Sequence, residues 1–151
     1  MDHNKKQQMY EGSRQLGKFI MQLRKLERKP HHFGEVGPLT PSEIHMVEAI
    51  GMDDAILMNE LASKLEITKG AVTQLVRRIE DKGLVRRSPD PNDARAIFLI
   101  LTEKGKEAYR AHENVQVQFY EQLYKQLTAQ EVDVFKTCMK KLNQFLGTMK
   151  G

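Results

Sequence analysis

An apolar stripe of helical period that breaks once and restarts constrains this 151-residue chain more than any other feature. The spacing i, i+3, i+4, i+7 occurs twice, in Met58, Leu61, Ala62 and Leu65 and again in Val72, Leu75, Val76 and Ile79. Such spacing is typical of helices with one buried face. Thr68 follows the break at Glu66-Ile67 as a cap for the second helix, and Gly83 suits the residue just past its end. The sequence predicts two short helices joined by a tight turn.

Two apolar stretches after Gly83 predict a β-hairpin. "LVRRS" and "AIFLIL" read as strands, and they flank "PDPNDAR", a polar turn with two prolines. A helix pair followed by a hairpin predicts a mainly α fold with a small β-wing, a winged helix-turn-helix.

The remaining segments predict helices on both sides of this unit. A first helix covers roughly residues 6–28, and "RKPHHFGEVGP" breaks the chain as a loop. Thr40, Pro41 and Glu43 form a capping-box start for a helix that stops at Gly51. A long helix begins at Thr102, and Thr128 caps the last one.

Apolar residues in the last helix alternate steps of three and four, as in a coiled-coil seam: Val132, Phe135, Met139, Leu142, Leu146 and Met149. The seam packs either within the chain or against a second copy. We expect a homodimer, because one small domain has few places to bury three long amphipathic helices. Residues 1–38 and 102–151 then form a helical dimerisation region, and residues 39–101 form the winged helix-turn-helix lobe.

The composition is consistent with this fold and indicates the cellular compartment. Apolar residues make up 40% and charged residues 29%, as in a globular chain. The net charge is +4 and the pI is about 9.2, which favours anionic partners. No apolar run approaches the ~20 residues that cross a membrane, no signal core is present, and Cys138 is the single cysteine. We expect a cytoplasmic protein with no membrane association.

The far side of the second helix carries residues suited to DNA: Thr68, Lys69, Gly70, Thr73, Gln74, Arg77 and Arg78. Thr73 and Gln74 can bond base edges, while Lys69, Arg77 and Arg78 can neutralise phosphates or reach guanine. The alternative is a solvated surface helix. The hairpin favours DNA, because Arg86, Arg87 and Arg95 have no obvious structural need and an arginine at a hairpin tip suits a narrow minor groove.

The stretch "LASKLEITKGAVTQLVRRIEDKGLVRRSPDPNDARAIFLILTEKG" resembles the core of the MarR family of winged-helix regulators, most specifically in "DPNDAR" followed by "LTEKG". The resemblance extends over essentially the whole chain. It implies that Arg95 enters the minor groove, that Asp93 holds it through an ion pair, and that Thr68 to Arg78 form the major-groove helix. It also implies a repressor, and a dimer that reads a palindromic DNA site with half-sites about one helical turn apart.

Regulators of this family respond to small anions, oxidants or metals. In a zinc-sensing branch, Glu27, His45 and His112 match three ligand positions, but Gln116 stands at the fourth. His31, His32 or Glu113 can substitute, since zinc accepts four N/O ligands. Cys138, beside three lysines, is a candidate redox sensor or a packed residue. Phe19, Leu23, Met46 and Tyr109 line a small-molecule pocket or form plain core. No cofactor is required.

Competing functions find less support in the residues. We expect no enzyme, because no Ser-His-Asp set, phosphate-binding glycine loop or paired acids stand in a recognisable context. A winged-helix protein-interaction module is expected to lack the basic residues that this chain keeps. An RNA binder is expected to show stacking aromatics, and residues 68–95 contain none.

Overall fold

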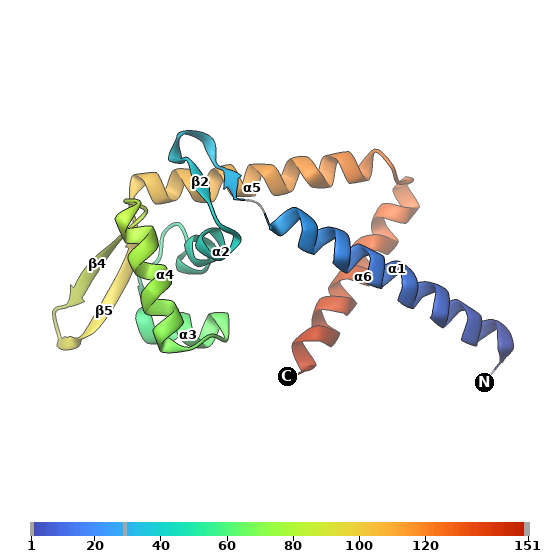
Figure 1. Ribbon diagram of the computed structural model, residues 1–151, viewed down its shortest axis with the longest axis horizontal. Coiled ribbons are helices and arrows are strands. Elements are labelled where there is room, and N and C mark those ends of the chain that lie inside the picture. The colour runs from blue at the N-terminus through green and yellow to red at the C-terminus, as the bar shows by residue number, and fades with distance from the viewer. Residues whose placement is uncertain (1, 29, 150–151) are drawn as a thin grey trace. The chain divides into compact units, whose positions relative to one another are not determined.

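The structure is a computed structural model that describes residues 2–28 and 30–149. The chain divides into two compact units, Met1–Ala111 and His112–Gly151. The elements, labelled in Figure 1, are α1 His3–Glu27, β1 His31–His32, η1 Gly34–Val36, β2 Pro38–Leu39, α2 Pro41–Ile50, β3 Ile56–Leu57, α3 Met58–Leu65, α4 Lys69–Asp81, β4 Val85–Asp90, β5 Asp93–Leu101, α5 Glu103–Tyr124 and α6 Ala129–Thr148. The predicted fold class, mainly helical with a small β-wing, is confirmed.

The segment between α1 and α2 is more ordered than the expected loop. His31 and His32 pair antiparallel with Leu39 and Pro38, so a short two-stranded ladder encloses the 3-10 turn η1. Leu39 is buried, and its packing brings the second strand onto the lobe. The prediction that the whole segment is a loop was therefore wrong. Two-residue strands containing proline leave almost no pattern of alternation in a sequence.

Helix α2 begins as the sequence predicts. The Thr40 hydroxyl accepts from the backbone N–H of Glu43 at 3.2 Å, and the Glu43 carboxylate accepts from the N–H of Thr40 at 3.1 Å. This capping box is joined by Pro41 in the first turn, and Gly51 ends the helix with φ of 84°.

A buried carboxylate fixes α2 to the end of α4. Glu43 is 3% exposed, and its Oε2 lies 2.6 Å from the Nζ of Lys82. The Lys82 ammonium also donates to the carbonyl of Pro38 at 3.2 Å. Because a buried charge is costly unless it is paired, these contacts make the capping box and the α2–α4 packing depend on each other.

Helices α3 and α4 form the expected helix-turn-helix. Glu66 ends α3 in the left-handed conformation, with φ of 53°, and its N–H bonds back to Ser63. The Thr68 hydroxyl then caps α4 by accepting from the N–H of Ala71 at 3.1 Å. The tight turn places both apolar faces on one core.

The wing is a three-stranded antiparallel sheet in the order β3-β5-β4. The expected strands "LVRRS" and "AIFLIL" exist but are longer, so only Pro91 and Asn92 remain in the turn. The prediction that "PDPNDAR" is entirely a turn was wrong, because Pro89, Asp90 and Asp93 pair across the hairpin. Strand β3 was missed, since two residues, Ile56 and Leu57, carry too little pattern to be recognised.

The core of the lobe is built from α2, α3, α4, the sheet and the start of α5. Its most buried side chains include Leu39, Met46, Val47, Ile50, Leu61, Val72, Val76, Ile79, Leu84, Leu99 and Ala108. Helix α4 and the wing therefore pack on one continuous core. Figure 1 shows α4 beside β4 and β5.

The first turn of α5 is fastened to the turn between α4 and β4. Gly83, with φ of 74°, and Leu84 donate back to the carbonyls of Glu80 and Ile79, which closes α4 in a Schellman motif. Thr102 donates its hydroxyl to the carbonyl of Gly83 at 2.5 Å and its N–H to that of Leu84 at 3.0 Å. The same hydroxyl accepts from the N–H of Gly105.

The second unit contains the rest of α5 and the capped helix α6. The Thr128 and Glu131 capping box is present, as the sequence predicts for Thr128. Tyr120 meets Tyr124 edge-on at 5.3 Å between ring centroids and Phe135 at 6.3 Å. None of the helices in the described residues is both long and apolar enough to span a bilayer.

Gly105→Ala is expected to destabilise the lobe strongly. A Cβ at this position would lie 2.0 Å from the carbonyl oxygen of Leu84, a backbone atom that the Thr102 contact holds in place. We expect a loss of at least ~3 kcal/mol in the free energy of unfolding, as for severe overpacking. Urea denaturation at fixed protein concentration measures the loss.

Gly70→Ala is the matched control for that substitution. Gly70 is also helical, but a Cβ there meets no atom within 4 Å. Because alanine is the better helix former, this variant should be neutral or more stable by up to ~1 kcal/mol. Equal unfolding free energies for the two variants would contradict the assignment of Gly105 as a close-packing residue.

Candidate nucleic-acid interface

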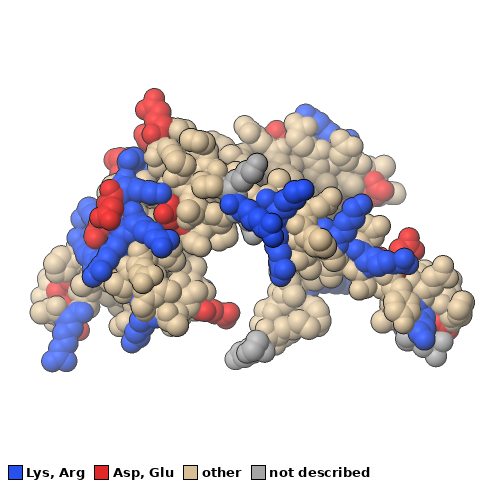
Figure 2. Space-filling model, in the orientation of Figure 1, with Lys and Arg blue, Asp and Glu red and all other residues tan. Residues whose placement is uncertain are grey.

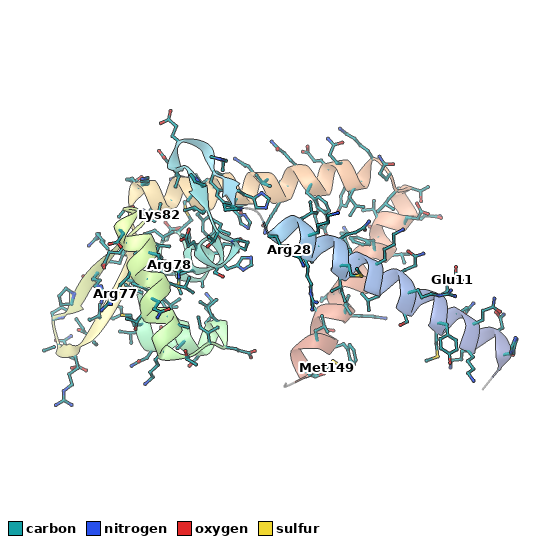
Figure 3. The ribbon with its side chains drawn as sticks, viewed as in Figure 1. Glu11, Arg28, Arg77, Arg78, Lys82 and Met149 are labelled. Carbon is teal, nitrogen blue, oxygen red and sulfur yellow. The ribbon has the colours of Figure 1, made fainter. Side chains whose placement is uncertain are left out.

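Helix α4 presents two chemically different faces. Val72, Val76 and Ile79 are buried in the core. The opposite face exposes Lys69, Gly70, Gln74, Arg77 and Arg78. Figure 3 shows Arg77 and Arg78 following one another along the helix, with Lys82 at its end. The core thus orients the helix so that its polar and basic residues face outward together.

The threonines of α4 are partly engaged in the helix itself. Thr68 is exposed, and its oxygen caps the first turn. Thr73 is half-buried, and its hydroxyl donates to the carbonyl of Lys69 at 2.9 Å. Its proton is therefore used, while its oxygen can still accept from a base amino group and its methyl can contact thymine.

The wing tip is shaped by two carboxylates and a bulge. Asp90 accepts from the N–H of Asn92 and Asp93 from that of Arg95, both at 2.9 Å. The pairing passes from Pro89 with Ile97 to Asp90 with Asp93, so residues 94–96 of β5 have no partners on β4. This bulge re-aims the strand and leaves the Arg95 side chain exposed at the tip.

Asp93 holds Arg95 in a different way from the one expected. The sequence-based expectation was an ion pair between the carboxylate and the guanidinium. In the structure the carboxylate instead accepts from the backbone N–H of Arg95. Asp93 therefore fixes the backbone of the tip and leaves the arginine head group available to another anion.

A hollow of about 450 Å³ lies between the wing and helix α4. Its polar lining brings together Lys69 and Thr73 of α4 with Asp93 and Arg95 of β5, and Asn59 of α3 lies beside them. Figure 2 shows Lys and Arg side chains on the surface that α4 and the hairpin form. Segments far apart in sequence thus place groups that are able to bond bases and phosphates around one concave surface.

The sequence alone did not indicate that Asn59 and its neighbours belong to the site. Leu57, Met58 and Asn59 line the hollow because β3 pairs with β5 immediately before α3 begins. The short apolar run "AILM" was the one signal in the sequence that pointed to this strand.

Arg87 is also exposed, but its guanidinium forms an ion pair within the lobe. Its Nε donates to Oε2 of Glu80 on α4 at 3.0 Å, in an ion pair whose side chains are 33% and 35% exposed. The head group is thus already engaged within the lobe.

The candidate metal ligands are spread over several elements. His45 is exposed on α2, and His31 and His32 are exposed on β1, where His31 Nε2 lies 3.2 Å from the carbonyl oxygen of Leu26. Glu27 ends α1, but its side chain lies outside the described residues. In the second unit, Nε2 of His112 lies 3.0 Å from Nε2 of Gln116. No group of three or more His, Cys, Asp or Glu suited to a metal ion is found among the described residues.

The remaining candidate sensor residues lie either on exposed helix surfaces or in the core. Cys138 is exposed on α6. Phe19 and Leu23 are exposed on α1, whereas Met46 is fully buried and Tyr109 packs against the core. Met46 therefore belongs to the core, which was the alternative reading of that residue.

Comparisons with known proteins agree with this geometry. A family model described as MarR family matches residues 38–96. The multiple antibiotic resistance protein MarR of Escherichia coli (strain K12) is 30% identical over 129 residues, which cover 84% of this chain and 90% of the relative.

Solved structures show the same architecture. Streptococcus pneumoniae FabT in complex with DNA gives a TM-score of 0.75 at 23% identity, covering 95% of this chain and 99% of that one, and it supports the fold. A mutant MarR from E. coli complexed with operator DNA gives 0.64 at 27% identity, covering 85% and 93%. From its sequence relatives and its winged fold together, the chain belongs to the MarR family of transcriptional regulators.

Proposed function

We propose that this protein is a sequence-specific repressor that binds a palindromic operator as a homodimer and releases it in response to an effector. One observation carries the proposal. Lys69 and Thr73 near the start of α4 line the same hollow as Arg95 of the wing, so one lobe presents groups for two adjacent grooves. Family membership establishes a DNA-binding transcriptional regulator, and the remaining features are inferences from this geometry and from the family.

The residues divide by groove and by task. Gln74 and Thr73 are placed to read base edges in the major groove, and Gly70 leaves room for close approach of the DNA. Lys69, Arg77 and Arg78 neutralise phosphates or reach guanine. The exposed guanidinium of Arg95 enters the minor groove, where negative potential is enhanced at narrow sites.

The proposed homodimer rests on apolar side chains that remain exposed. They lie on α1, on the end of α5 and on α6, and include Met9, Leu16, Phe19, Ile20, Leu23, Val117, Phe119, Phe145, Leu146 and Met149. Such faces on long helices mark association surfaces. A second copy that covers them sets the two copies of α4, the proposed recognition helices, about one turn of DNA apart, ~10 bp, which requires a palindromic site.

For the effector we propose a chemical class, a small molecule, as expected for this family. We also propose that the protein is cytoplasmic and that it catalyses no reaction. Zinc sensing through Glu27, His45 and His112, and redox sensing through Cys138, remain predictions. Operator affinity measured with zinc and with a chelator tests the first, and the peroxide response of Cys138→Ser tests the second.

Arg95→Ala should weaken operator binding by about 10-fold to 100-fold, the range for loss of a good base or groove contact. The side chain is exposed at the wing tip and contributes to none of the core packing. Fluorescence anisotropy at fixed salt measures the affinity, and sedimentation should show an unchanged oligomeric state. Wild-type affinity for the operator would refute the wing assignment.

Gln74→Ala and Arg78→Ala should fail in different ways. Loss of Gln74 removes a base-edge contact, so the ratio of specific to non-specific affinity should fall by about 10-fold or more. Loss of Arg78 removes a phosphate contact, so binding should weaken on every sequence and the salt slope should decrease by about 1. Titrations on operator and scrambled duplexes at several salt concentrations separate the two effects. Identical behaviour of the two variants would show that the assigned roles are wrong.

Leu146→Glu should weaken self-association by about 10-fold or more, because it places an unpaired charge in the proposed apolar interface. Leu146 is 53% exposed in the single chain, so the substitution spares the core of the lobe. Gln144→Glu, exposed and two positions away on the same helix, is the control with the same added charge. Sedimentation equilibrium decides, and equal association of both variants argues against an interface that includes this face of α6.

A further inference from the structure

Sheet geometry places Arg87 on the inner face of the wing. Arg87 pairs directly with Leu99 on β5, and Leu99 pairs directly with Ile56 on β3. Residues paired directly across strands extend to the same face of a sheet. Leu99 is fully buried, so Arg87 extends from the face of the sheet that packs on the core, although on the edge strand β4 the residue itself stays exposed. Arg86 and Ile100 form the next row on the other face.

The Arg87 guanidinium connects three elements. Its Nε lies 3.0 Å from Oε2 of Glu80 on α4, and its Nη1 lies 3.9 Å from the sulfur of Met58 on α3. Among the described residues, Glu80–Arg87 is the one ion pair between the recognition helix and the wing. Both side chains are about two-thirds buried, so solvent and salt screen the pair less than a fully exposed one.

The position of this pair along both elements matters for DNA. Glu80 lies one turn after Val76 and Arg77 on α4. Arg87 lies two residues before Pro89, where the pairing shifts and the strand turns toward the tip that carries Arg95. The pair thus joins the helix that faces the major groove to the stem of the wing that faces the minor groove.

We propose that Arg87 is a positioning residue whose ion pair with Glu80 sets the angle of the wing relative to the recognition helix, rather than a phosphate ligand. This inference rests on the proposed function and revises the prediction, from the sequence, of a DNA contact by Arg87. A wing fixed before binding adds affinity, because less conformational freedom is lost when both grooves are engaged at once.

The competing view is that Glu80 masks a phosphate ligand in the free protein, and Glu80→Gln separates the two by the sign of its effect. Removal of an acidic group near DNA strengthens binding on electrostatic grounds, and release of a masked arginine strengthens it further. Loss of a positioning contact weakens binding instead. Asp81→Asn removes the same charge from the next residue of α4, which is exposed, and it serves as the matched control.

The experiment uses the full-length protein and two duplexes, one enriched by this protein from a random-sequence library and one scrambled. We expect Glu80→Gln to lose about fivefold in affinity for the enriched duplex, the effect of a pair worth ~1 kcal/mol, with no loss on the scrambled one. Arg87→Gln should show the same loss with an unchanged salt slope, and the double variant should be no weaker than Arg87→Gln alone. Asp81→Asn should bind as the wild type or more tightly.

Each result has a definite reading. Tighter or unchanged binding by Glu80→Gln overturns the inference, as does a salt slope lowered by about 1 in Arg87→Gln, the signature of a lost phosphate contact. Thermal unfolding of each variant provides a second readout. An equal fractional loss on both duplexes that follows a lowered unfolding temperature also overturns the inference, because it indicates a purely structural role. A wild-type protein that enriches no sequence overturns the proposed function itself and this inference with it.

Discussion

The close approach of Gly105 to the carbonyl of Leu84 is the constraint on which the lobe depends. At this point the end of α4, the start of β4, the end of β5 and the start of α5 converge. A side chain at residue 105 would separate α5 from the Gly83–Leu84 turn and break the hydrogen bonds of Thr102 to both carbonyls. The resemblance in "LTEKG" thus has a physical meaning, since Thr102 provides the cap and Gly105 the space, while Lys104 donates to the carbonyl of Lys82. Helix α4 and the wing are held together at the end away from the wing tip.

Polar side chains inside the lobe have hydrogen-bond partners, whereas those on the outer face of α4 and at the wing tip are exposed to solvent. The buried Glu43 is bonded by Thr40 and Lys82, and no buried side-chain nitrogen or oxygen in the described residues lacks a partner. Gln74, Arg77, Arg78 and Arg95 are exposed instead. Water solvates these exposed side chains in the free protein, so they need no partner within the chain and can bond an anionic ligand.

The sequence predicts the helical parts of this fold well because capping and periodicity are local. Thr40, Thr68 and Thr128 each cap the helix they were assigned to, and the stripe ending in Ile79 is buried. Strand β3 and the bulge at residues 94–96 depend on pairing with distant residues, so local patterns are too weak to identify them. The same limit explains Arg87. Its chemistry is that of a DNA contact, and only the register with Leu99 and the contact with Glu80 show that it extends toward α4. The contact between Asp93 and the Arg95 backbone likewise depends on the geometry of the turn.

The close approach at Gly105 and the proposed role of the Glu80–Arg87 pair would together limit the movement of α4 against the wing. If the protein acts as the proposed homodimer, an effector that releases DNA must then change the relation between the two lobes rather than the interior of either. The helices suited to carry such a change are those whose apolar faces remain exposed in the single chain, α1, the end of α5 and α6. Their contacts in a dimer can exist in more than one arrangement, and an effector that binds one arrangement better shifts the spacing of the recognition helices. Regulation and DNA recognition would thus depend on separate sets of residues, since core packing fixes the reading surface while association sets its spacing.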